Sequence, residues 1–334
     1  MSPLLPPSPT AATPRARPGA GATRVGLFVA DQFPLAPLSL VIEALRLANW
    51  GEEDEVFTYT LISADGQPRA SSCAFPAPVD HSVENCPPLD VALVCTGRNS
   101  SQIAEPEVLR WLRRLHREGT RVGAISGGAF VLARAGLLDG RSCAIHWEAV
   151  PSMAEAFHAV TVSGDIFCID GRIITCAGGV STLDLMLHLI EHFRGKAVAR
   201  RVADDLIYPN LRGGHEPARI DLKKRTGVTN ATLLRAVEIM EANVEEPVKV
   251  ARISAALGTS TRHLERLFAR AFRMSPSRYY MQLRLKQARA LLSQTQLPVV
   301  EVALRCGFRN TSHFARRYRE MYRVLPSAER RAGL

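Results

Sequence analysis

The stretch RVGAISGGAFVL (residues 121–132) has the pattern of a strand, a sharp turn and the start of a helix. The short apolar segment 122–125 leads to Ser126, two glycines follow, and helix-forming residues continue from Ala129. α/β enzymes present a nucleophile on such a strand-to-helix turn. The stretch therefore predicts an α/β fold with Ser126 at the turn.

Segments on both sides of this turn alternate between strand and helix patterns. The predicted strands are 25–30, 57–63, 89–95 and 122–125, with a β-pair at 166–169 and 173–176, and the predicted helices are 38–50, 105–117 and 181–193. Such alternation gives a mainly parallel sheet with helices on both faces. Ligands of these sheets bind at the carboxyl ends of the strands, where Ser126 stands. The predicted N-terminal domain is therefore α/β and flavodoxin-like.

The composition of the chain sets limits on its class. A length of 334 residues suits two ordinary domains, and no apolar run approaches the ~18–20 residues of a membrane span. Residues 1–23 include six prolines and predict a disordered tail. The seven cysteines are scattered and odd in number, so we expect no disulfide framework, no metal site and a reducing cytoplasm. No cofactor is expected.

Positive charge is concentrated in the last third of the sequence. Residues 221–334 hold 22 Lys and Arg against 9 Asp and Glu, a net charge of +13, whereas residues 1–220 have a net charge of −3. A basic module beside a nearly neutral one suggests nucleic acid as the partner of that module. Charge alone leaves a solvated basic surface open as the alternative.

Two segments of the basic third resemble each other, ISAALGTSTRHLERLFARAFRMSP (253–276) and VALRCGFRNTSHFARRYREMYRVLP (302–326). The corresponding pairs are Phe268 and Tyr318, Phe272 and Tyr322, His263 and His313, Arg266 and Arg316, and Pro276 and Pro326. Each segment predicts a helix, a tight turn at Gly258 or Gly307, and a second helix. The C-terminal domain is therefore expected to be all-α, with two helix-turn-helix units.

The second helix of each unit has an apolar and a polar face. Ser260 stands at the N-cap position of the first such helix. Buried positions are expected at Leu264, Leu267, Phe268, Phe272, Phe314, Tyr318 and Met321. An outward Arg can reach guanine O6 and N7 together, and Ser or Thr can serve several base edges. The residues predicted to contact DNA are Arg262, His263, Glu265, Arg266, Thr311, Ser312, His313 and Arg316.

The same segments resemble a known family. The order AALGTSTRHLERLFAR, SPSRYYMQLRLKQARALL and VALRCGFRNTSHFARRYR, closed by Pro326, resembles the DNA-binding domain of AraC-type transcriptional regulators over about residues 228–330. The resemblance implies a monomer that places two recognition helices in successive major-groove turns, roughly 34 Å apart. An unbroken helix at 277–293 would fix that spacing.

The first two thirds of the chain resemble a second family. His146 lies in CAIHWE (143–148), 20 residues after Ser126, and this part is similar to the PfpI-type branch of the class I glutamine amidotransferase-like superfamily. Members carry a Cys at the elbow, often a His about that far downstream, and an acid from the loop after the first strand. With FPLAPLSLVIEALRLAN and SGGAFVLARAGLLDGRSCAIHWE, the chain from about residue 24 to 330 resembles the amidase-like, GlxA-type AraC-family regulators.

The elbow departs from the enzyme pattern. Ser126 stands where the enzymes have Cys, and the position of the acid falls on Pro37, with Asp31 slightly earlier. Ser is a weak nucleophile unless a base and an orienting acid act on it. Three interpretations stay open: catalysis by Ser126 with His146, a Ser chosen only for a tight turn, and a pocket that binds a small molecule without transforming it. We favour the pocket and expect no enzymatic activity.

The predicted pocket is formed by the elbow and neighbouring strand ends. Its expected members are Ser126, Gly127, His146, Trp147, Glu148, Phe33, Thr96, Gly97 and Arg98. Backbone N–H groups at the helix start suit a carboxylate, whereas Trp147 and Phe33 would stack on a cationic head group that Glu148 would pair with. Relatives that the chain resembles respond to amino-acid-derived or quaternary-amine nutrients such as arginine, betaine or carnitine. The resemblance thus implies a zwitterionic effector.

The sequence divides into a tail (1–23), a ligand-sensing domain (24–207), a linker (208–226) and a DNA-binding domain (227–334). Glycine and charge in the linker favour a flexible connection. We predict a cytoplasmic, ligand-responsive activator of a catabolic operon, with double-stranded DNA, a small-molecule effector, RNA polymerase and a second copy of the chain as partners. The alternatives are a Ser- or Cys-type hydrolase with an accessory DNA-binding module, and an architectural DNA-binding protein without a sensor.

Overall fold

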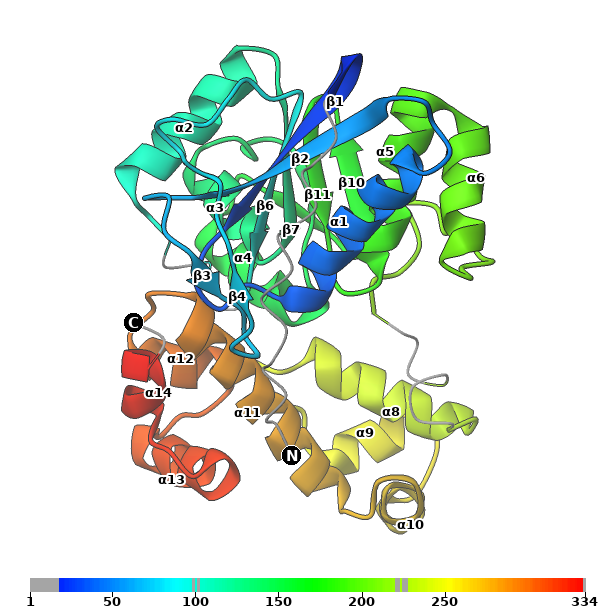
Figure 1. Ribbon diagram of the computed structural model, residues 1–334. Helices are drawn as coiled ribbons and strands as arrows, with labels where there is room; N and C mark the ends of the chain where they lie inside the picture. Colours follow the sequence, from blue (N-terminus) through cyan, green and yellow to red (C-terminus); the bar gives the residue numbers. More distant parts are fainter. Residues whose placement is uncertain (1–17, 98–99, 101–102, 220–222, 224–227, 333–334) are drawn as a thin grey trace, which may run out of the picture.

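The computed structural model describes residues 18–97, 100, 103–219, 223 and 228–332, and Figure 1 shows an α/β part above a helical part. The strands are β1 (Pro18–Val29), β2 (Glu55–Ser63), β3 (Arg69–Ala70), β4 (Pro76–Ala77), β5 (His81–Ser82), β6 (Val91–Thr96), β7 (Arg121–Ser126), β8 (Ser142–Ala144), β9 (Thr161–Ser163), β10 (Phe167–Asp170) and β11 (Ile173–Cys176). The helices of the α/β part are α1 (Leu35–Asn49), α2 (Pro106–Arg117), α3 (Gly128–Arg134), the 3₁₀ helix η2 (Trp147–Ala149), α4 (Val150–Ala156), α5 (Ser181–Arg194) and α6 (Lys196–Asp205). The helical part holds α8 (Ala231–Ala242), α9 (Val250–Ala256), α10 (Thr261–Phe272), α11 (Pro276–Gln294), α12 (Val299–Arg305), α13 (Thr311–Tyr322) and α14 (Pro326–Ala332).

Seven strands form the main sheet, in the order β10, β11, β7, β6, β1, β2, β5. Neighbouring strands are parallel except β10, which pairs with β11 in antiparallel register, Phe167 opposite Cys176. Every residue of β6, near the centre, is buried, as expected for a strand that is covered on both faces. The predicted mainly parallel sheet and the predicted β-pair are therefore confirmed, and the pair lies at the edge of the sheet.

Helices cover both faces of this sheet (Figure 1). α1, α5 and α6 pack on one face, and α2, α3 and α4 pack on the other. Alternate residues of β1 serve the two cores, because Val25, Leu27 and Val29 face the first group of helices and Phe28 faces the second. This period of two is the geometry of an extended strand. Trp111, predicted to point inward from α2, is 3% exposed.

The first strand begins earlier than expected. Residues 18–23, assigned to the disordered tail because of their composition, belong to β1, whereas residues 1–17 lie outside the described part of the chain. Pro18 pairs with Glu55 at the start of β2. A distant strand therefore supplies the partner for this segment, which its own proline- and glycine-rich sequence does not reveal.

The helical part has two apolar cores that share one helix. α8, α9 and α10 contribute to the first core, and α12 and α13 contribute to the second. α11 adds Tyr280 to the first core and Leu285, Ala288 and Leu292 to the second. One continuous helix thus joins the two helix-turn-helix units, as the unbroken segment 277–293 predicted.

The two units repeat each other in their turns and caps. Ser260 Oγ and Asn310 Oδ1 each accept a hydrogen bond from the backbone amide three residues later, at the start of α10 and α13. Gly258 and Gly307, in the turns before these helices, have φ values of 62° and 72°. Such left-handed values favour glycine at the end of a helix. The expected N-cap at Ser260 and the two glycine turns are confirmed.

The segment that joins the two parts is fastened to the sheet. The Ile166 amide donates to the Glu216 carbonyl and the Ala218 amide donates to the Gly164 carbonyl, both at 2.8 Å, so the segment lies along the start of the edge strand β10. Gly214 lies so close to this edge that an added Cβ would come within 2.8 Å of an aromatic ring. The expected flexible connection is wrong for this stretch, because backbone hydrogen bonds hold it in place.

The described residues include no helix that is long and apolar enough to span a membrane. No group of three His, Cys, Asp or Glu side chains among them is arranged to hold a metal ion. All seven cysteines are free thiols.

Candidate functional site

β7 ends in the sharp turn that the sequence predicted. Ser126 has a φ of +57°, a left-handed value that residues with a side chain rarely adopt. A Cβ on Gly127 would lie 2.1 Å from the Gly97 carbonyl oxygen, and a Cβ on Gly128 would lie 2.2 Å from that of Val94. Both positions therefore need glycine. The turn keeps the strained geometry of a nucleophile elbow.

The elbow lacks the partners that would activate its serine. Among the residues with described positions, none forms a hydrogen bond with Ser126 Oγ. His146 Nδ1 accepts the Glu148 amide at 3.4 Å and so caps η2. Pro37 is buried in α1, and Asp31 accepts a 3.1 Å hydrogen bond from a backbone amide of β3. A serine without an assembled base does not have the arrangement of a nucleophile.

Two thiols close to the elbow strand are buried. Cys95 lies on β6 and Cys176 on β11, one strand to either side of β7. Complete burial raises the pKa of Cys95 to about 12, and burial also raises the pKa of Cys176. The thiolate is the reactive form of cysteine, and both thiols stay protonated at neutral pH. They do not offer a substitute nucleophile for Ser126.

Three predicted pocket residues serve the framework instead, and a fourth is not described. Phe33 is fully buried in the core under α1, so the expectation that its ring stacks on an effector is wrong in this structure. Thr96 is 1% exposed, and its hydroxyl lies 2.8 Å from that of Ser100. Gly97 supports the elbow through its carbonyl. Arg98 lies outside the described residues.

The short helix η2 groups the remaining predicted side chains. The rings of His146 and Trp147 lie 5.5 Å apart, and Glu148 Oε2 lies 3.9 Å from His146 Nδ1. Trp147 is 38% exposed. The guanidinium of Arg219, which no pattern in the sequence singled out, lies 5.0 Å from the centre of the Trp147 ring. Residues 146–148 and Arg219 are called the η2 cluster below.

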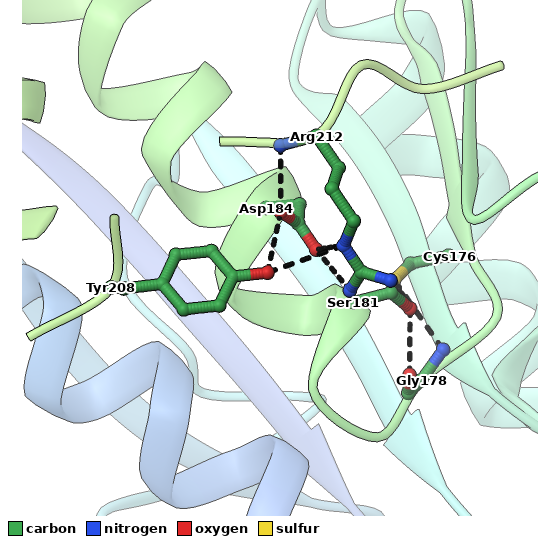
Figure 2. Close-up of polar contacts among 6 residues, drawn as sticks. All are labelled: Cys176, Gly178, Ser181, Asp184, Tyr208 and Arg212. Carbon is green, nitrogen blue, oxygen red and sulfur yellow. Dashed lines mark hydrogen bonds and ion pairs between the residues drawn. The ribbon is translucent and has the colours of Figure 1, made fainter. Parts of the chain in front are cut away.

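A buried carboxylate fastens the linker to α5. Figure 2 shows Asp184 between two linker side chains: Tyr208 Oη donates to Oδ1 at 2.9 Å, and Arg212 donates to Oδ2 from Nε at 3.1 Å and from Nη2 at 2.6 Å. The Asp184 side chain is fully buried. Burial and the Asp184 carboxylate raise the pKa of Tyr208, so its hydroxyl stays protonated and donates. The loop before α5 also passes the elbow, since a Cβ on Gly178 would lie 2.7 Å from Ser126 Cβ.

The α/β part contacts the helical part through η2 and α4, both of which pack against α11. Arg219 forms an ion pair with Glu241 on α8 at 2.7 Å, and Glu155 on α4 forms one with Arg305 on α12 at 2.5 Å. The linker is thus tied to α8, which packs on the first helix-turn-helix unit, and α4 is tied to the second unit. The sequence indicates two separate folding units and predicts neither tie.

The residues predicted to read DNA lie on the outer faces of α10 and α13. Exposed positions are Arg262, Glu265, Arg266, Thr311, Ser312 and Arg316, and partly buried ones are His263 and His313. Figure 1 shows both helices on the side of the helical part that is far from the sheet. The recognition faces are therefore accessible while the α/β part and the helical part are in contact.

Burial and the neighbouring Arg317 lower the pKa of His313, so this imidazole is neutral at pH 7.

Two grooves were not anticipated. One of about 360 Å³ follows α13 and is lined in part by Arg316, Arg319 and Arg323, whose charge suits phosphate groups. The other, of about 750 Å³, follows α2 and is lined in part by Arg110 and Arg114. None of the predicted effector residues whose positions the structure describes lines the second groove.

Comparison with known proteins assigns both parts to families. Residues 23–192 match the DJ-1/PfpI family, and residues 253–332 match a helix-turn-helix domain. The chain is 38% identical to the HTH-type transcriptional regulator GbdR of Pseudomonas aeruginosa over 92% of its own length and 83% of that protein. It is 34% identical to the HTH-type transcriptional regulator GlxA of Rhizobium meliloti over 93% of its own length and 96% of that protein.

A solved structure is also similar. The crystal structure of an AraC family transcriptional regulator from Pseudomonas putida is 27% identical, with a TM-score of 0.50, over 55% of this chain and 99% of that one. Since the curated relatives match along nearly the whole chain and are regulators, this chain is a DNA-binding transcriptional regulator. The chain belongs to the AraC-family transcriptional regulators that carry a DJ-1/PfpI domain.

Proposed function

We propose that this regulator binds a small-molecule effector at the elbow and the η2 cluster and, in response, activates a catabolic operon. The observation that carries the proposal is a strained elbow without an assembled base, in a domain where His146 lies next to both the Trp147 ring and the Glu148 carboxylate. The N–H groups of the elbow suit a carboxylate, and Trp147 with Glu148 suits a cationic head group. The favoured effector is therefore an amino-acid-derived or quaternary-amine zwitterion.

Exposure of the recognition helices supports an activator. Because the outer faces of α10 and α13 are accessible, we infer that the protein occupies DNA without effector. Binding of the effector would then change the surface that the DNA-bound protein presents to RNA polymerase. The proposal keeps residues 24–207 as the sensing and dimerising domain, 208–226 as the linker and 227–334 as the DNA-binding domain. It places the regulator in the cytoplasm, with its operator.

A metabolite screen on the full-length protein tests the proposed effector class. Amino-acid-derived and quaternary-amine compounds should raise the melting temperature, because a ligand at 100 times its Kd adds about 2.7 kcal/mol to the free energy of unfolding. Neutral sugars at the same concentrations are the control. If no amine or zwitterion shifts the transition, the proposed class is wrong.

Replacing Trp147 by alanine should abolish the effector response and leave DNA binding nearly intact. The ring lies in η2, whereas the DNA-reading faces lie on α10 and α13, so the basal Kd for operator DNA should change only a few-fold. The response, a coupling of ~1–3 kcal/mol, should disappear. Operator titrations with and without the compound from the screen measure both quantities. A full response in Trp147→Ala would place the effector elsewhere.

The strained Ser126 also fits the rival function, a serine hydrolase with an accessory DNA-binding module. We expect the purified protein to hydrolyse amides and esters no faster than its Ser126→Ala variant, because no base is assembled at the elbow. Mass spectrometry after exposure to an activated ester measures acylation directly. An acyl group on Ser126 that the variant lacks would support the hydrolase.

A further inference from the structure

Arg219 links Trp147 to α8, which packs in one core with the first helix-turn-helix unit. Its guanidinium lies 5.0 Å from the centre of the Trp147 ring, within the ~6 Å range of a cation–π interaction. The same group donates to both oxygens of Glu241 on α8, at 2.9 Å from Nη1 and 2.7 Å from Nη2. One cation is therefore shared between an aromatic ring of the α/β part and a carboxylate of the helical part.

The surroundings of this guanidinium would suit other cations. An aromatic face attracts ammonium and guanidinium groups alike. Trp147 offers that face, and Glu241 holds the guanidinium of Arg219 on it. Arg219 does not satisfy all of its hydrogen-bond donors in this position, because its Nε is buried and has no hydrogen-bond partner among the described residues. An unpaired buried donor makes the bound guanidinium easier to displace.

We propose that Arg219 is an internal stand-in for the cationic head group of the effector, which binds on Trp147 by displacing it. The inference rests on the proposed function and adds the ligand chemistry of the site and its route to the DNA-binding domain. Displacement ends the ion pair with Glu241, so α8 loses its tie to the linker. The tie between Glu155 and Arg305 does not involve the Trp147 ring and remains. Because α11 joins both units, the helical part then pivots about this second tie.

Tetramethylammonium and methylguanidinium serve as probes of the site. Each is titrated into the full-length protein at constant ionic strength, with sodium as the control cation, while tryptophan fluorescence is followed. The Trp147→Ala variant gives the background of Trp50 and Trp111. Arg219→Ala removes the internal competitor, so the Kd of either probe should be about 3- to 30-fold lower than for the wild type.

Two further variants test whether the signal passes from Trp147 to α8 through the ion pair of Arg219 with Glu241. Glu241→Gln should also lower the probe Kd, because Arg219 loses its charged anchor while the side-chain shape is kept. Arg305→Ala is the matched control: it breaks the other tie and should leave the probe Kd unchanged. Far-UV circular dichroism should be the same for all variants, because each replaced side chain is partly exposed.

The outcomes separate the inference from the proposed function. If the probe Kd of Arg219→Ala is equal to or higher than that of the wild type, Arg219 is not a stand-in for the cationic head group. This conclusion holds even if Trp147→Ala abolishes binding. Calorimetric titration measures probe binding to Trp147→Ala, which lacks the reporting ring, and binding that survives there overturns the effector site itself. An unchanged Kd in Glu241→Gln, with tighter binding in Arg219→Ala, overturns the route through α8.

Discussion

Replacing Arg266 and Arg316 together by alanine is expected to weaken operator binding by roughly 30- to 10⁴-fold, at ~1–3 kcal/mol for each arginine. Arg266 is exposed on α10 and Arg316 is exposed on α13, so the double variant removes one guanidinium from each recognition helix without opening a core. Each lost group would leave base edges without a bidentate donor. Affinity should also fall steeply with salt, because phosphate contacts by the basic residues contribute much of it.

Fluorescence anisotropy on genomic fragments selected by the wild-type protein measures this loss. Arg235→Ala is the matched control, since Arg235 belongs to the same domain but lies on α8 and pairs with Glu238. Its loss should change the Kd little, because exposed ion pairs contribute ~0–1 kcal/mol. Equal affinity of the double variant and the wild type would show that α10 and α13 do not read the DNA.

Replacing Asp184 by alanine is expected to lower the free energy of unfolding by about 2–4 kcal/mol. The buried carboxylate holds Tyr208 and Arg212, and its loss leaves a guanidinium and a hydroxyl without their partner. Breaking a buried pair costs ~3–5 kcal/mol, and the cost is smaller here because Arg212 is 31% exposed and can turn toward water. The linker should also detach from α5.

Thermal unfolding and limited trypsin digestion measure the two effects. The variant should melt several degrees lower, and cleavage after Arg212 and Arg219 should accelerate because the detached linker becomes accessible. Glu238→Ala, which removes only an exposed carboxylate, should match the wild type in both assays. A wild-type melting temperature with an unchanged digestion pattern in Asp184→Ala would contradict the role of this network.

Local patterns in the sequence were enough to predict most elements. The turn at Ser126 and the cap at Ser260 depend on residues within a few positions, and the structure has both. The duplicated units even repeat their last residues, since Arg273 and Arg323 end α10 and α13 with φ values of 57° and 64°. Short-range hydrogen bonds and steric limits decide such features, so one sequence contains the information.

Contacts between distant segments could not be predicted in the same way. The helix STLDLMLHLIEHF (181–193) carries one acidic residue in its apolar first half, which is a signal for a buried, partnered carboxylate. Nothing local identifies Tyr208 and Arg212 as its partners. Arg219 likewise adds only one charge to the composition of the linker. Composition suggested a flexible connection because it does not record which backbone groups find hydrogen bonds elsewhere.

Phe33 shows a different limit. An aromatic residue after a strand can line a pocket or fill a core, and the sequence pattern is the same in both cases. In the structure α1 covers this position, and the Phe33 ring is fully buried. Trp147, predicted by the same reasoning, lies in η2 and stays 38% exposed. The packing of neighbouring elements decides between these two outcomes, and one sequence does not specify it locally.

Chemical footprinting of operator DNA bound by the full-length protein tests most directly that one chain reads two successive segments of the major groove. For each bound chain we expect protected guanines in two groups roughly 34 Å apart, one for α10 and one for α13. Arg266→Ala should remove protection from one group only, and Arg316→Ala from the other only. A single protected group, or loss of both groups in each single variant, would contradict the assignment of two separate recognition helices.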